Sequence, residues 1–391
     1  MSKLDELIAE LCPDGVEYKT LGTICEIRSG WGFPNIEQGK TSGDYPFYKV
    51  GDMNSFGNEF VMTVANNYVD LETATRLRCK PAPKGTVIFP KIGAAIGTNK
   101  KRILAQEACY DNNIIGLIPS DAVISRYLFY QMEAVNLMRF ADYSGAMPSI
   151  RKTTLEKFRI PVPPLPVQQE IVRILDNFTE LTAELTAELT ARRKQYEYYR
   201  DFLLTFGDEV EWTTLGEVAI NLDSKRKPVA KGKRKAGEYP YYGASGIVDY
   251  VDDYIFDGDY LLVSEDGANL VARVTPIAFS ASGKIWVNNH AHVLEFETYE
   301  DRKFIEYYLN MIDLSRFLST AAQPKLTQEN LNKIPVPAPS FEEKERIVAI
   351  LDRFDALCND LTSGIPAEIE ARQKQYEYYR DKLLSFKEVT A

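Results

Sequence analysis

Two histidines, His290 and His292, are the residues whose type and spacing come nearest to a metal site in this sequence. Side chains two positions apart on a strand point to the same face, so two imidazoles there could share a metal ion. A zinc site needs at least one more protein ligand, and no third ligand is visible in the sequence around this pair. The sequence therefore favours two partly exposed strand residues and predicts no metal site.

Three further stretches resemble pieces of catalytic sites, but each lacks an essential part. The segment 93–98 has no lysine after its second glycine, as a phosphate-binding loop requires. The segment 111–114 is similar to the polar tetrapeptide of amino-methyltransferases, but it lacks both prolines and no glycine-rich cofactor loop precedes it. Asp259, Glu265 and Asp266 could serve a nuclease, yet no lysine stands two positions after Glu265 or Asp266. The sequence thus predicts no catalytic residue and no enzyme.

Positive charge gathers in two stretches, although the whole chain has a net charge of −10. Residues 76–102 contain eight basic residues and no acidic one, and residues 225–235 contain seven basic residues in eleven positions. One such run by itself is readily explained as a solvated surface. A run in each half of the chain favours binding to nucleic acid, because the distribution of charge matters more than its sum.

A repeat organises the whole chain. The segment Gln195–Asp201 recurs without change as Gln375–Asp381, 180 positions later, and Ile160–Pro163 recurs as Ile334–Pro337. An internal repeat of this kind indicates a tandem duplication and decides the fold before any other feature. We predict four segments: a first globular domain at 1–160, a first long helix at 161–207, a second globular domain at 208–334 and a second long helix at 335–391.

The two globular segments share a scaffold and differ in their loops. Three pairs of segments match: 16–22 with 210–216, 45–48 with 239–242, and Asn112-Asn113 with Asn288-Asn289. Short apolar runs and helical periodicity predict an α+β fold, with helices at 4–11 and 125–140 and strands at 24–27, 45–50, 86–90 and 114–118. The loops differ most where Trp31–Pro34 is replaced by the basic run 225–235.

Apolar residues three or four positions apart predict a long helix in each half. The first is expected from Pro166 to Phe206, and the second from Ser340, which forms a capping-box pattern with Glu343. Gly364 and Pro366 should bend or break the second helix near its middle. Two helices of matching pattern, each longer than its own domain needs, are expected to pair with one another as in a coiled coil.

The composition is ordinary for a protein that folds in water. Hydrophobic residues make up 45% and charged residues 26% of the chain. No apolar run reaches the length of about 18 residues that a membrane span needs. The five cysteines are scattered without ligand spacing, as is typical of free thiols in a reducing cytoplasm. The first residues do not have the pattern of a signal peptide, so we expect a cytoplasmic protein.

The residues that flank the two helices resemble one protein family. Both helices end in Arg-x-Lys-Gln-Tyr-Glu-Tyr-Tyr-Arg-Asp-x-Leu-Leu, and each follows an Ile-Pro-Val-Pro segment. The chain thereby resembles, over nearly its whole length, the DNA-specificity subunit of type I restriction-modification enzymes. The resemblance implies two similar target-recognition domains, separated by two long antiparallel helices that form a coiled-coil-like spacer with a pseudo-two-fold repeat.

The same resemblance implies what the chain does and with which partners. Each domain would read one half of a bipartite, asymmetric target in double-stranded DNA, and the chain itself would do no chemistry. Two methylating subunits are expected to supply S-adenosylmethionine chemistry, and restriction subunits are expected to use ATP and Mg for translocation and cleavage. No cofactor is expected on this chain, and no membrane among its partners.

The resemblance places the DNA-facing residues in loops of the two domains. Basic side chains there would hold phosphates, and Asn, Gln and Arg could read base edges, whereas each aromatic could equally be a core residue. The expected DNA-binding residues are Trp31, Tyr48, Lys49, Lys91, Asn99, Lys100, Lys101, Ser149, Lys225, Arg226, Lys227, Lys233, Arg234, Lys235, Tyr242, Asn269, Gln323 and Lys325.

Tyrosines at the ends of the two helices occupy more than one helix face, so a single seam between the helices cannot bury all of them. An amphipathic ring of this kind suits a protein interface. We therefore expect the methylating subunits to bind at Tyr196, Tyr198, Tyr199, Tyr376, Tyr378 and Tyr379, with packing under the globular domains as the alternative.

Two other functions stay open at this point. One is a self-contained restriction or methylation enzyme, which the missing cofactor loop and tetrapeptide disfavour; incubating the pure chain with DNA and cofactors would test it. The other is a duplicated protein-binding scaffold without DNA affinity. A salt-dependent gel shift of the assembled complex would separate that scaffold from a DNA-recognition subunit.

Overall fold

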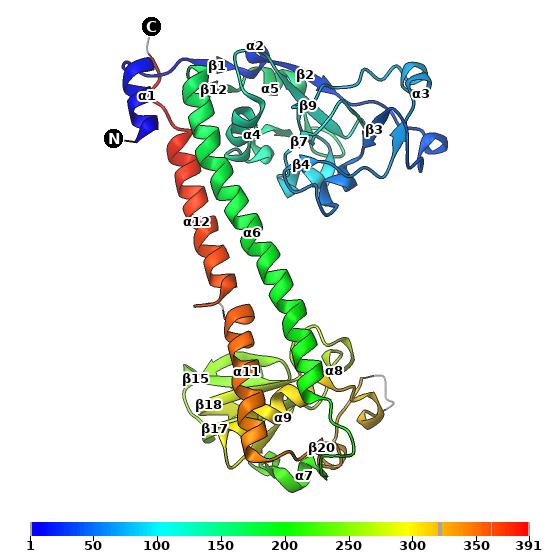
Figure 1. The fold of residues 1–391 in the computed structure, drawn as a ribbon, viewed down its shortest axis with the longest axis vertical. Coiled ribbons are helices and arrows are strands. Elements are labelled where there is room, and N and C mark those ends of the chain that lie inside the picture. Colours follow the sequence, from blue (N-terminus) through cyan, green and yellow to red (C-terminus); the bar gives the residue numbers. More distant parts are fainter. Residues whose placement is uncertain (1, 320–322, 361, 390–391) are drawn as a thin grey trace. The chain divides into compact units, whose positions relative to one another are not determined.

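The computed structural model describes residues 2–319, 323–360 and 362–389 (Figure 1). The chain forms two compact units: unit 1 comprises Met1–Glu184 and Ile369–Ala391, and unit 2 comprises Leu185–Glu368. Each unit combines a globular part with segments of both long helices. The mixture of helices and mainly antiparallel sheets within each unit confirms the α+β class. The four sequence-based segment boundaries stay a prediction.

Unit 1 is built around a five-stranded sheet with the strand order β2-β9-β6-β7-β4 and a three-stranded sheet with the order β5-β3-β8. The short sheets β1-β12 and β10-β11 complete it. Its elements in chain order are α1 (Lys3–Leu11), β1 (Tyr18–Thr20), α2 (Leu21–Ile24), β2 (Cys25–Ser29), η1 (Asn35–Glu37), β3 (Tyr45–Tyr48), η2 (Val50–Asn54), β4 (Val61–Met62), β5 (Tyr68–Val69), α3 (Leu71–Arg76), β6 (Val87–Pro90), η3 (Gly93–Thr98), β7 (Arg102–Leu104), β8 (Cys109–Tyr110), β9 (Ile114–Pro119), α4 (Ser125–Glu133), η4 (Leu137–Phe140), β10 (Ala141–Asp142), β11 (Ser149–Ile150), α5 (Lys152–Glu156), β12 (Arg159–Pro161), the first half of α6 (Leu165–Leu204) and most of α12 (Ile365–Leu383).

Unit 2 contains a six-stranded sheet with the order β14-β19-β17-β18-β15-β16 and the short sheet β13-β20. After the second half of α6, its elements are β13 (Trp212–Thr214), α7 (Leu215–Val218), β14 (Ile220–Asn221), η5 (Asp223–Lys225), η6 (Lys231–Lys233), β15 (Ala236–Gly243), β16 (Gly246–Val251), β17 (Phe256–Ser264), α8 (Asn269–Ala272), β18 (Ala278–Val287), β19 (Ala291–Glu295), α9 (Tyr299–Met311), η7 (Ser315–Phe317), α10 (Gln328–Asn332), β20 (Pro335–Pro337) and α11 (Phe341–Asn359).

The two units repeat the same strand registers, which confirms the prediction of two similar domains. Tyr18 lies opposite Pro161 in unit 1, and Trp212 lies opposite Pro337 in unit 2. At the centre of the large sheets, Val87 pairs with Leu117 in unit 1, and the equivalent Leu261 pairs with Leu294 in unit 2. Two predicted matches are displaced. Pro161 takes the place of Pro337 and not of Pro335, so Ile160–Pro163 and Ile334–Pro337 are shifted by two residues. The match of the two asparagine pairs is shifted by one residue. Strand β9 begins at Ile114 and β19 at Ala291, so Asn112-Asn113 corresponds to Asn289-His290 and not to Asn288-Asn289.

Each central strand separates two apolar cores, because side chains alternate between the faces of a sheet. In β6, Val87 and Phe89 pack in the core that contains residues of α4 and α6, while Ile88 packs with Tyr48 and Tyr110 on the other side. In unit 2, β17 divides its residues between two cores in the same way. Apolar burial on both faces therefore holds the sheet rigidly and leaves the strand ends to carry the loops.

A half-buried aspartate on each long helix fixes that helix to its unit. Asp176 of α6 accepts hydrogen bonds from the Tyr130 hydroxyl and from Arg126 Nε, the latter at 2.8 Å. Asp352 of α11 accepts from the Tyr307 hydroxyl at 2.6 Å and from the Tyr299 hydroxyl at 2.7 Å. Hydrogen bonds to an ionised acceptor are stronger than neutral ones, so both anchors resist sliding of the helix.

The long helices run antiparallel where they meet inside each unit. In unit 2, Tyr199 of α6 stacks on Phe354 of α11, with ring centroids 5.6 Å apart, and the earlier Arg193 reaches the later Cys358 carbonyl. In unit 1, the ring of Phe178 stacks on Tyr379 of α12 at 5.5 Å. Figure 1 shows α12 beside the first half of α6 and α11 beside its second half. The predicted pairing of the helices is thus confirmed within each unit.

The predicted interruption of the second helix is also confirmed. Helix α11 ends at Asn359 and α12 begins at Ile365. A Cβ atom at Gly364 would lie 2.5 Å from the Ala356 carbonyl oxygen, so only glycine fits this close approach. Pro366 is tolerated because an amide donor is not needed in the first turn of α12. Only half of the predicted capping box forms: the Glu343 amide donates to Ser340 Oγ at 3.3 Å, while the Glu343 carboxylate binds Arg346.

The helix predicted over 125–140 is shorter than expected. Helix α4 ends at Glu133, and a separate 3₁₀ helix, η4, follows. The Met138 amide donates to Asn136 Oδ1 at 2.9 Å, so Asn136 acts as the cap of η4. Asparagine favours such a cap over a helix interior because its side chain competes for backbone donors. Within the described residues, no helix is long and apolar enough to cross a membrane.

Candidate nucleic-acid interface

In unit 1, the loops expected to face DNA meet at one turn, Asp111–Asn113, between β8 and β9. The Trp31 amide donates to the Tyr110 carbonyl at 3.0 Å, and the Asp111 amide donates to the Tyr48 carbonyl at 2.9 Å. These two hydrogen bonds hold the loops after β2 and after β3 against the start of the turn.

The other two loops of unit 1 are held at the end of the same turn. The Lys91 amide donates to the Asn113 carbonyl at 2.8 Å. The Gly93 amide donates to the Pro148 carbonyl, and the Ile150 amide to the Lys91 carbonyl, both at 2.8 Å. The structure therefore brings together four segments that are far apart in the sequence, and backbone hydrogen bonds fix them in place.

Unit 2 builds the same frame around the turn Asn288–His290. The Asn288 amide donates to the Tyr242 carbonyl at 3.1 Å, and the Glu265 amide donates to the His290 carbonyl at 2.9 Å. The Lys227 amide contacts the Val287 carbonyl at 3.3 Å, and the Gly267 amide contacts the Pro324 carbonyl at 3.2 Å. The frame is repeated while its side chains change, since Trp31 is replaced by Lys227 and Lys91 by Glu265.

Three of the expected basic residues of unit 1 are available to an anion. Lys91 Nζ bonds Ser29 Oγ at 3.1 Å, Lys49 Nζ bonds Gln38 Oε1 at 3.0 Å, and Lys100 Nζ bonds Asn54. Within the described residues, none of the three has an acidic partner within 4.0 Å. Partial burial lowers the pKa of Lys91, although the nearby Asp111 carboxylate opposes that effect.

Two expected DNA-binding residues of unit 1 are core residues instead. Lys101 is fully buried, and its ammonium group donates to the Val135 carbonyl at 2.8 Å. Tyr48 is also buried, and its hydroxyl donates to the Met62 carbonyl at 3.0 Å. Neither side chain can touch DNA from this position. Asn99 is half-buried, has a left-handed backbone (φ 56°) and accepts the Leu137 amide at 2.8 Å, so its oxygen closes the loop.

Lys101 should make the stability of the protein depend on pH. Burial lowers its pKa to about 8, below the value of 10.5 expected for an exposed lysine. Below pH 8 the folded state must bury a charge, and above 10.5 both states are neutral, so this destabilisation disappears between those values. We expect Lys101→Met to raise the free energy of unfolding at pH 7 by up to about 3 kcal/mol.

Denaturant unfolding of both proteins at pH 7 and pH 10.5 measures this effect. The advantage of the variant over the wild type should shrink at the higher pH. The same variant should leave the salt dependence of DNA binding unchanged, because the ammonium group contacts only protein. If the variant bound DNA with a smaller salt slope, Lys101 would contact a phosphate and the assignment to the core would be wrong.

The basic run of unit 2 divides into exposed and engaged residues. Lys225, Lys227 and Lys233 are exposed, and within the described residues no acidic side chain lies within 4.0 Å of them. Lys235 is 82% exposed and lies 3.8 Å from Asp252. Arg234 instead pairs with Asp249 at 3.0 Å and covers the Tyr241 ring at 4.3 Å. Arg234 is therefore a structural residue, contrary to its prediction as a phosphate contact.

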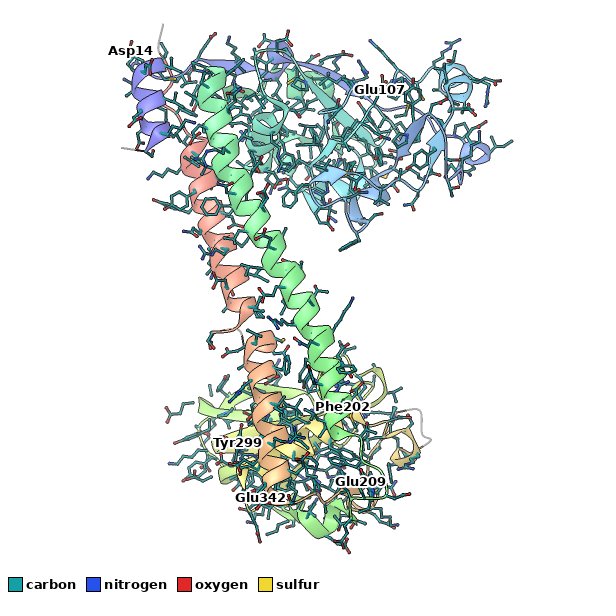
Figure 2. All side chains as sticks on the ribbon, viewed as in Figure 1. Asp14, Glu107, Phe202, Glu209, Tyr299 and Glu342 are labelled. Carbon is teal, nitrogen blue, oxygen red and sulfur yellow. The ribbon has the colours of Figure 1, made fainter. Side chains whose placement is uncertain are left out.

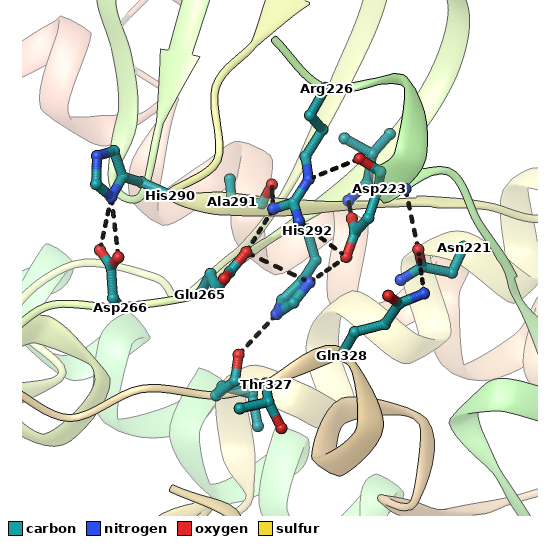
Figure 3. A network of polar contacts seen from close by, with 12 residues as sticks. Asn221, Asp223, Arg226, Glu265, Asp266, His290, Ala291, His292, Thr327 and Gln328 are labelled. Carbon is teal, nitrogen blue, oxygen red and sulfur yellow. Dashed lines mark hydrogen bonds and ion pairs between the residues drawn. The ribbon is translucent and has the colours of Figure 1, made fainter. Parts of the chain in front are cut away.

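Arg226 was also predicted to hold a phosphate, but it lies in a buried network of charges (Figure 3). Its guanidinium group is 2.5 Å from Glu265 Oε2 and 3.3 Å from Asp223 Oδ2, and it donates to the Ala291 carbonyl at 2.8 Å. Lys325, at 48% side-chain exposure, pairs with Glu265 Oε1 at 2.9 Å from the rim. Arg226 thus ties the basic loop to β17 and β19 and is not free to hold a phosphate.

His292 completes the network from strand β19. Its Nδ1 lies 2.6 Å from Asp223 Oδ2 and its Nε2 lies 2.8 Å from the Leu326 carbonyl oxygen. Both ring nitrogens of His292 therefore face hydrogen-bond acceptors. Burial, the largest influence, raises the pKa of Asp223, but the His292 hydrogen bond and charge outweigh it and hold that pKa below its ordinary value.

The same three residues form the arrangement nearest to a metal site in the described residues. Ligand atoms of Asp223, Glu265 and His292 lie within 4.8 Å of one another. Arg226 and Lys325 already bind the carboxylate oxygens that a metal would need. Burial, the largest influence, raises the pKa of Glu265, but the hydrogen bonds from Arg226 and Lys325 outweigh it. The pKa of Glu265 is therefore below its ordinary value. This donor set is an ion-pair network and does not fit a cation.

The two histidines do not share a face, so that part of the sequence analysis is wrong. His292 lies on β19 and is buried, whereas His290 precedes the strand, lies in the turn and is 50% exposed. Asn113 and His290 were not predicted from the sequence as candidates for the interface, whereas Asp266 lies in the loop 264–269 that was expected to face DNA. The register of the repeat was the one signal that could have found them, because it places Asn113 and His290 at equivalent positions.

The remaining expected residues fall into two groups. Trp31, Ser149 and Tyr242 are half-buried in the frame, and Tyr242 packs with Phe279 at a ring distance of 6.1 Å. Asn269 is engaged with its own loop, since its amide group bonds both the amide and the carbonyl of Thr275. Gln323 is exposed beside the short bridge between Asp266 and Lys325. Asn269 is thus a loop-closing residue, and the others stay candidates.

The helix-end tyrosines point in different directions. Tyr376 is buried and Tyr196 half-buried, and Arg380 and Arg200 lie over their rings at 5.7 and 5.9 Å. Tyr199 and Tyr379 stack on the facing helix, and Tyr198 and Tyr378 are exposed. In each repeat, one tyrosine (Tyr198 or Tyr378) therefore does not stack on the facing helix.

Comparison with known proteins places this architecture in one family. The family model of the type I restriction modification DNA specificity domain matches residues 13–192 and 207–371. The EcoprrI type I restriction enzyme specificity subunit of Escherichia coli is 31% identical over 394 residues, with 93% of each chain covered. A type I restriction enzyme specificity subunit of Haemophilus influenzae is 41% identical over 196 residues, which is 49% of this chain and half (50%) of that protein.

Solved structures share the fold. The S subunit of a type I restriction-modification system from M. genitalium gives a TM-score of 0.60 at 16% identity and covers 95% of this chain and 96% of that one. A chain from a structural study of the assembly and conformational transition of the type I R-M system gives 0.56 at 14% identity, covering 96% and 98%. The architecture is thus that of a duplicated specificity protein. This chain belongs to the type I restriction-modification DNA specificity family.

Proposed function

We propose that this chain is the non-catalytic DNA-recognition subunit of a type I restriction-modification complex. Each unit reads one half of a bipartite, asymmetric target in double-stranded DNA. Two methylating subunits carry S-adenosylmethionine and dock on the chain, and restriction subunits use ATP and Mg for translocation and cleavage. The chain binds no cofactor of its own and works in the cytoplasm. Family membership and the comparison proteins' names support this proposal.

One observation carries the proposal: both units repeat a four-loop frame, with the same backbone hydrogen bonds and different side chains. A duplicated scaffold that keeps its backbone and changes its exposed side chains suits a protein that reads two different short sequences. Phosphate contacts would fix the register, and base contacts would specify the sequence. The test is a salt-dependent gel shift of the assembled complex, followed by mapping of methylated adenines in a cell that carries this chain.

The two half-sites are expected to differ in sequence. Position for position, the frame carries Trp31 and Asn113 in unit 1 but Lys227 and His290 in unit 2. Side chains with different donors and acceptors cannot read the same base pairs equally well. Genome-wide mapping of methylated adenines checks this prediction, and a perfectly palindromic site would contradict it.

The exposed lysines of the basic run are expected to hold phosphates. We predict that Lys225→Ala, Lys227→Ala and Lys233→Ala, combined in one chain, weaken binding to all sequences alike. Removal of each phosphate contact should reduce the slope of log K against log salt by roughly 0.9. Titrations at several salt concentrations measure the slope, and the methylated sites should not change.

Arg226→Gln is the matched comparison for these three lysines. It removes a charge from the same run, but this arginine is bound to Asp223 and Glu265. We expect lower stability of unit 2 from the unpaired acids and no direct loss of a phosphate contact. An unchanged salt slope in the triple lysine variant would place the basic run away from DNA.

A further inference from the structure

We propose that Asn113 and His290, at equivalent positions of the two units, are specificity-determining residues that each read one base pair of their own half-site. The inference rests on the proposed function, because it assumes that the four-loop frame faces DNA. It goes further by naming one side chain per unit and the chemical group that the side chain reads.

The backbone at the two positions is fixed by the same hydrogen bonds. The amide of Asn113 donates to Asp111 Oδ1 at 3.0 Å, and the amide of His290 donates to Asn288 Oδ1 at 2.8 Å. Their carbonyls accept from the amides of Lys91 at 2.8 Å and Glu265 at 2.9 Å. Because the amide and the carbonyl of each residue are both hydrogen-bonded, its backbone is already fixed. The short side chain therefore loses little conformational entropy on binding.

The His290 side chain is oriented by Asp266. Its Nδ1 lies 3.0 and 2.9 Å from the two carboxylate oxygens, and Asp266 is only 19% exposed. The Asp266 backbone in turn forms a bridge with Lys325, so the partner is itself fixed by a second loop. A carboxylate can only accept, so Nδ1 carries the hydrogen and the neutral ring has its free lone pair at Nε2.

The outer edge of His290 is open to a ligand. In Figure 3 the ring meets Asp266 on one side and turns its other nitrogen away from the network. Within the described part of the chain, no hydrogen bond occupies Nε2, and the side chain is 50% exposed. A fixed acceptor of this kind matches the exocyclic amino group that cytosine or adenine presents in the major groove. We therefore assign to His290 a base with such a group.

Asn113 is held in the same manner by a different carboxylate. Its Nδ2 donates to Asp111 Oδ2 at 3.1 Å, and in the part of the chain that the structure describes no hydrogen bond occupies Oδ1 or the second amide hydrogen. An amide with one free acceptor and one free donor is the group that pairs with adenine N6 and N7. Thus both units use an acid to aim a neighbouring polar side chain, but the chemistry offered to the base differs.

The test compares the assembled complex of wild type and variants by the sequences that they methylate and bind. His290→Ala is expected to reduce discrimination at one base pair of one half-site by about 5- to 150-fold and to leave the other half-site unchanged. Asn113→Ala should do the same in the opposite half-site. His290→Asn, which places the unit 1 residue in the unit 2 frame, should change the preferred base at that same position.

Asp266 is tested as a positioning residue. Asp266→Ala should relax the same base pair as His290→Ala, and the double variant should be no worse than His290→Ala alone. Asp266→Asn keeps an acceptor for Nδ1 and should restore most of the discrimination. The control Lys225→Ala should weaken binding to all sequences without relaxing any position.

Two results would overturn the inference: an unchanged set of methylated sites in both His290 variants, or an equal loss of affinity for every sequence in His290→Ala. Either result would leave the proposed function standing, provided that the wild-type complex binds a specific target. If the wild-type complex bound no DNA specifically, the proposed function itself would be wrong. Normal co-purification of the methylating subunits with each variant excludes misfolding as the cause.

Discussion

Replacing Tyr198 and Tyr378 together by aspartate is expected to abolish binding of the methylating subunits while the chain stays folded. The two rings are 65% and 62% exposed, so their removal takes little from either core. A carboxylate placed in a protein interface must lose its hydration without gaining a partner. Removing two aromatic rings from the centre of an interface in this way should weaken assembly by roughly 100-fold or more.

The repeat itself explains why these two tyrosines, and not their neighbours, are the residues to change. Tyr196 and Tyr376 are turned towards the cores, and Tyr199 and Tyr379 are stacked on Phe354 and Phe178. Among the rings of the described residues, Tyr198 meets only Tyr199 and Phe202, and Phe202, labelled in Figure 2, is 67% exposed. Exposed aromatic rings that succeed one another along a helix mark an interaction surface.

Co-purification of the methylating subunit with the tagged chain measures the effect. Tyr198→Phe with Tyr378→Phe keeps the rings and should assemble normally, which is the matched control. Tyr196→Asp with Tyr376→Asp should instead destabilise the chain, because it places charges against the cores. If the exposed double aspartate variant still captured the methylating subunit in normal amounts, the docking surface would lie elsewhere.

The parts of the fold that depend on local pattern could be predicted from the sequence. The spacing of apolar residues predicts α6 to within two residues at its ends, and Gly364 and Pro366 predict the break between α11 and α12. Both effects arise within a few residues of chain, from helical periodicity and from backbone sterics. The repeat then extends each local prediction to the second half of the chain.

The candidate site could be predicted only in part, because its residues are fixed by partners far away in the sequence. A run of basic residues does not reveal that Arg226 will meet Glu265, 39 positions later. Nor does it reveal that Lys101 will enter the core beside Val135. The displacement of one residue between the two turns has the same origin, since strand pairing decides that register and local composition does not.

The most consequential expected result concerns a short tandem repeat inside α6. Thr182–Leu185 is repeated at once as Thr186–Leu189, and the helix is continuous through both copies. The division between the compact units falls at Glu184 and Leu185, inside this repeat. Residues 183, 184 and 186–188 are exposed, so an insertion here disturbs neither core. Adding one further Thr-Ala-Glu-Leu copy should therefore leave each unit intact.

The two halves of the chain already differ in length across this region. Phe178 and Phe354 are equivalent at an offset of 176, whereas Tyr199 and Tyr379 are equivalent at 180. The four additional residues of the second half fall where its helix is interrupted, between Asn359 and Ile365. The interruption makes α6 the one continuous helix of the pair through this region, so α6 is the element whose length an insertion changes directly.

A third copy is expected to lengthen the unread spacer between the half-sites by one base pair. Four residues add about 6 Å to a helix and turn the remainder of that helix by about 400°, a net of about 40°. One base pair of DNA turns by about 34–36° and rises about 3.4 Å, so the rotation agrees and helix tilt must absorb the excess rise. The three-copy variant should thus stop methylating the original sites and methylate sites with the same half-sites one base pair further apart. Sequencing of methylated adenines decides between the outcomes: an unchanged spacer would make the repeat mere helix filler, and altered half-sites would mean that the insertion disturbs the recognition loops.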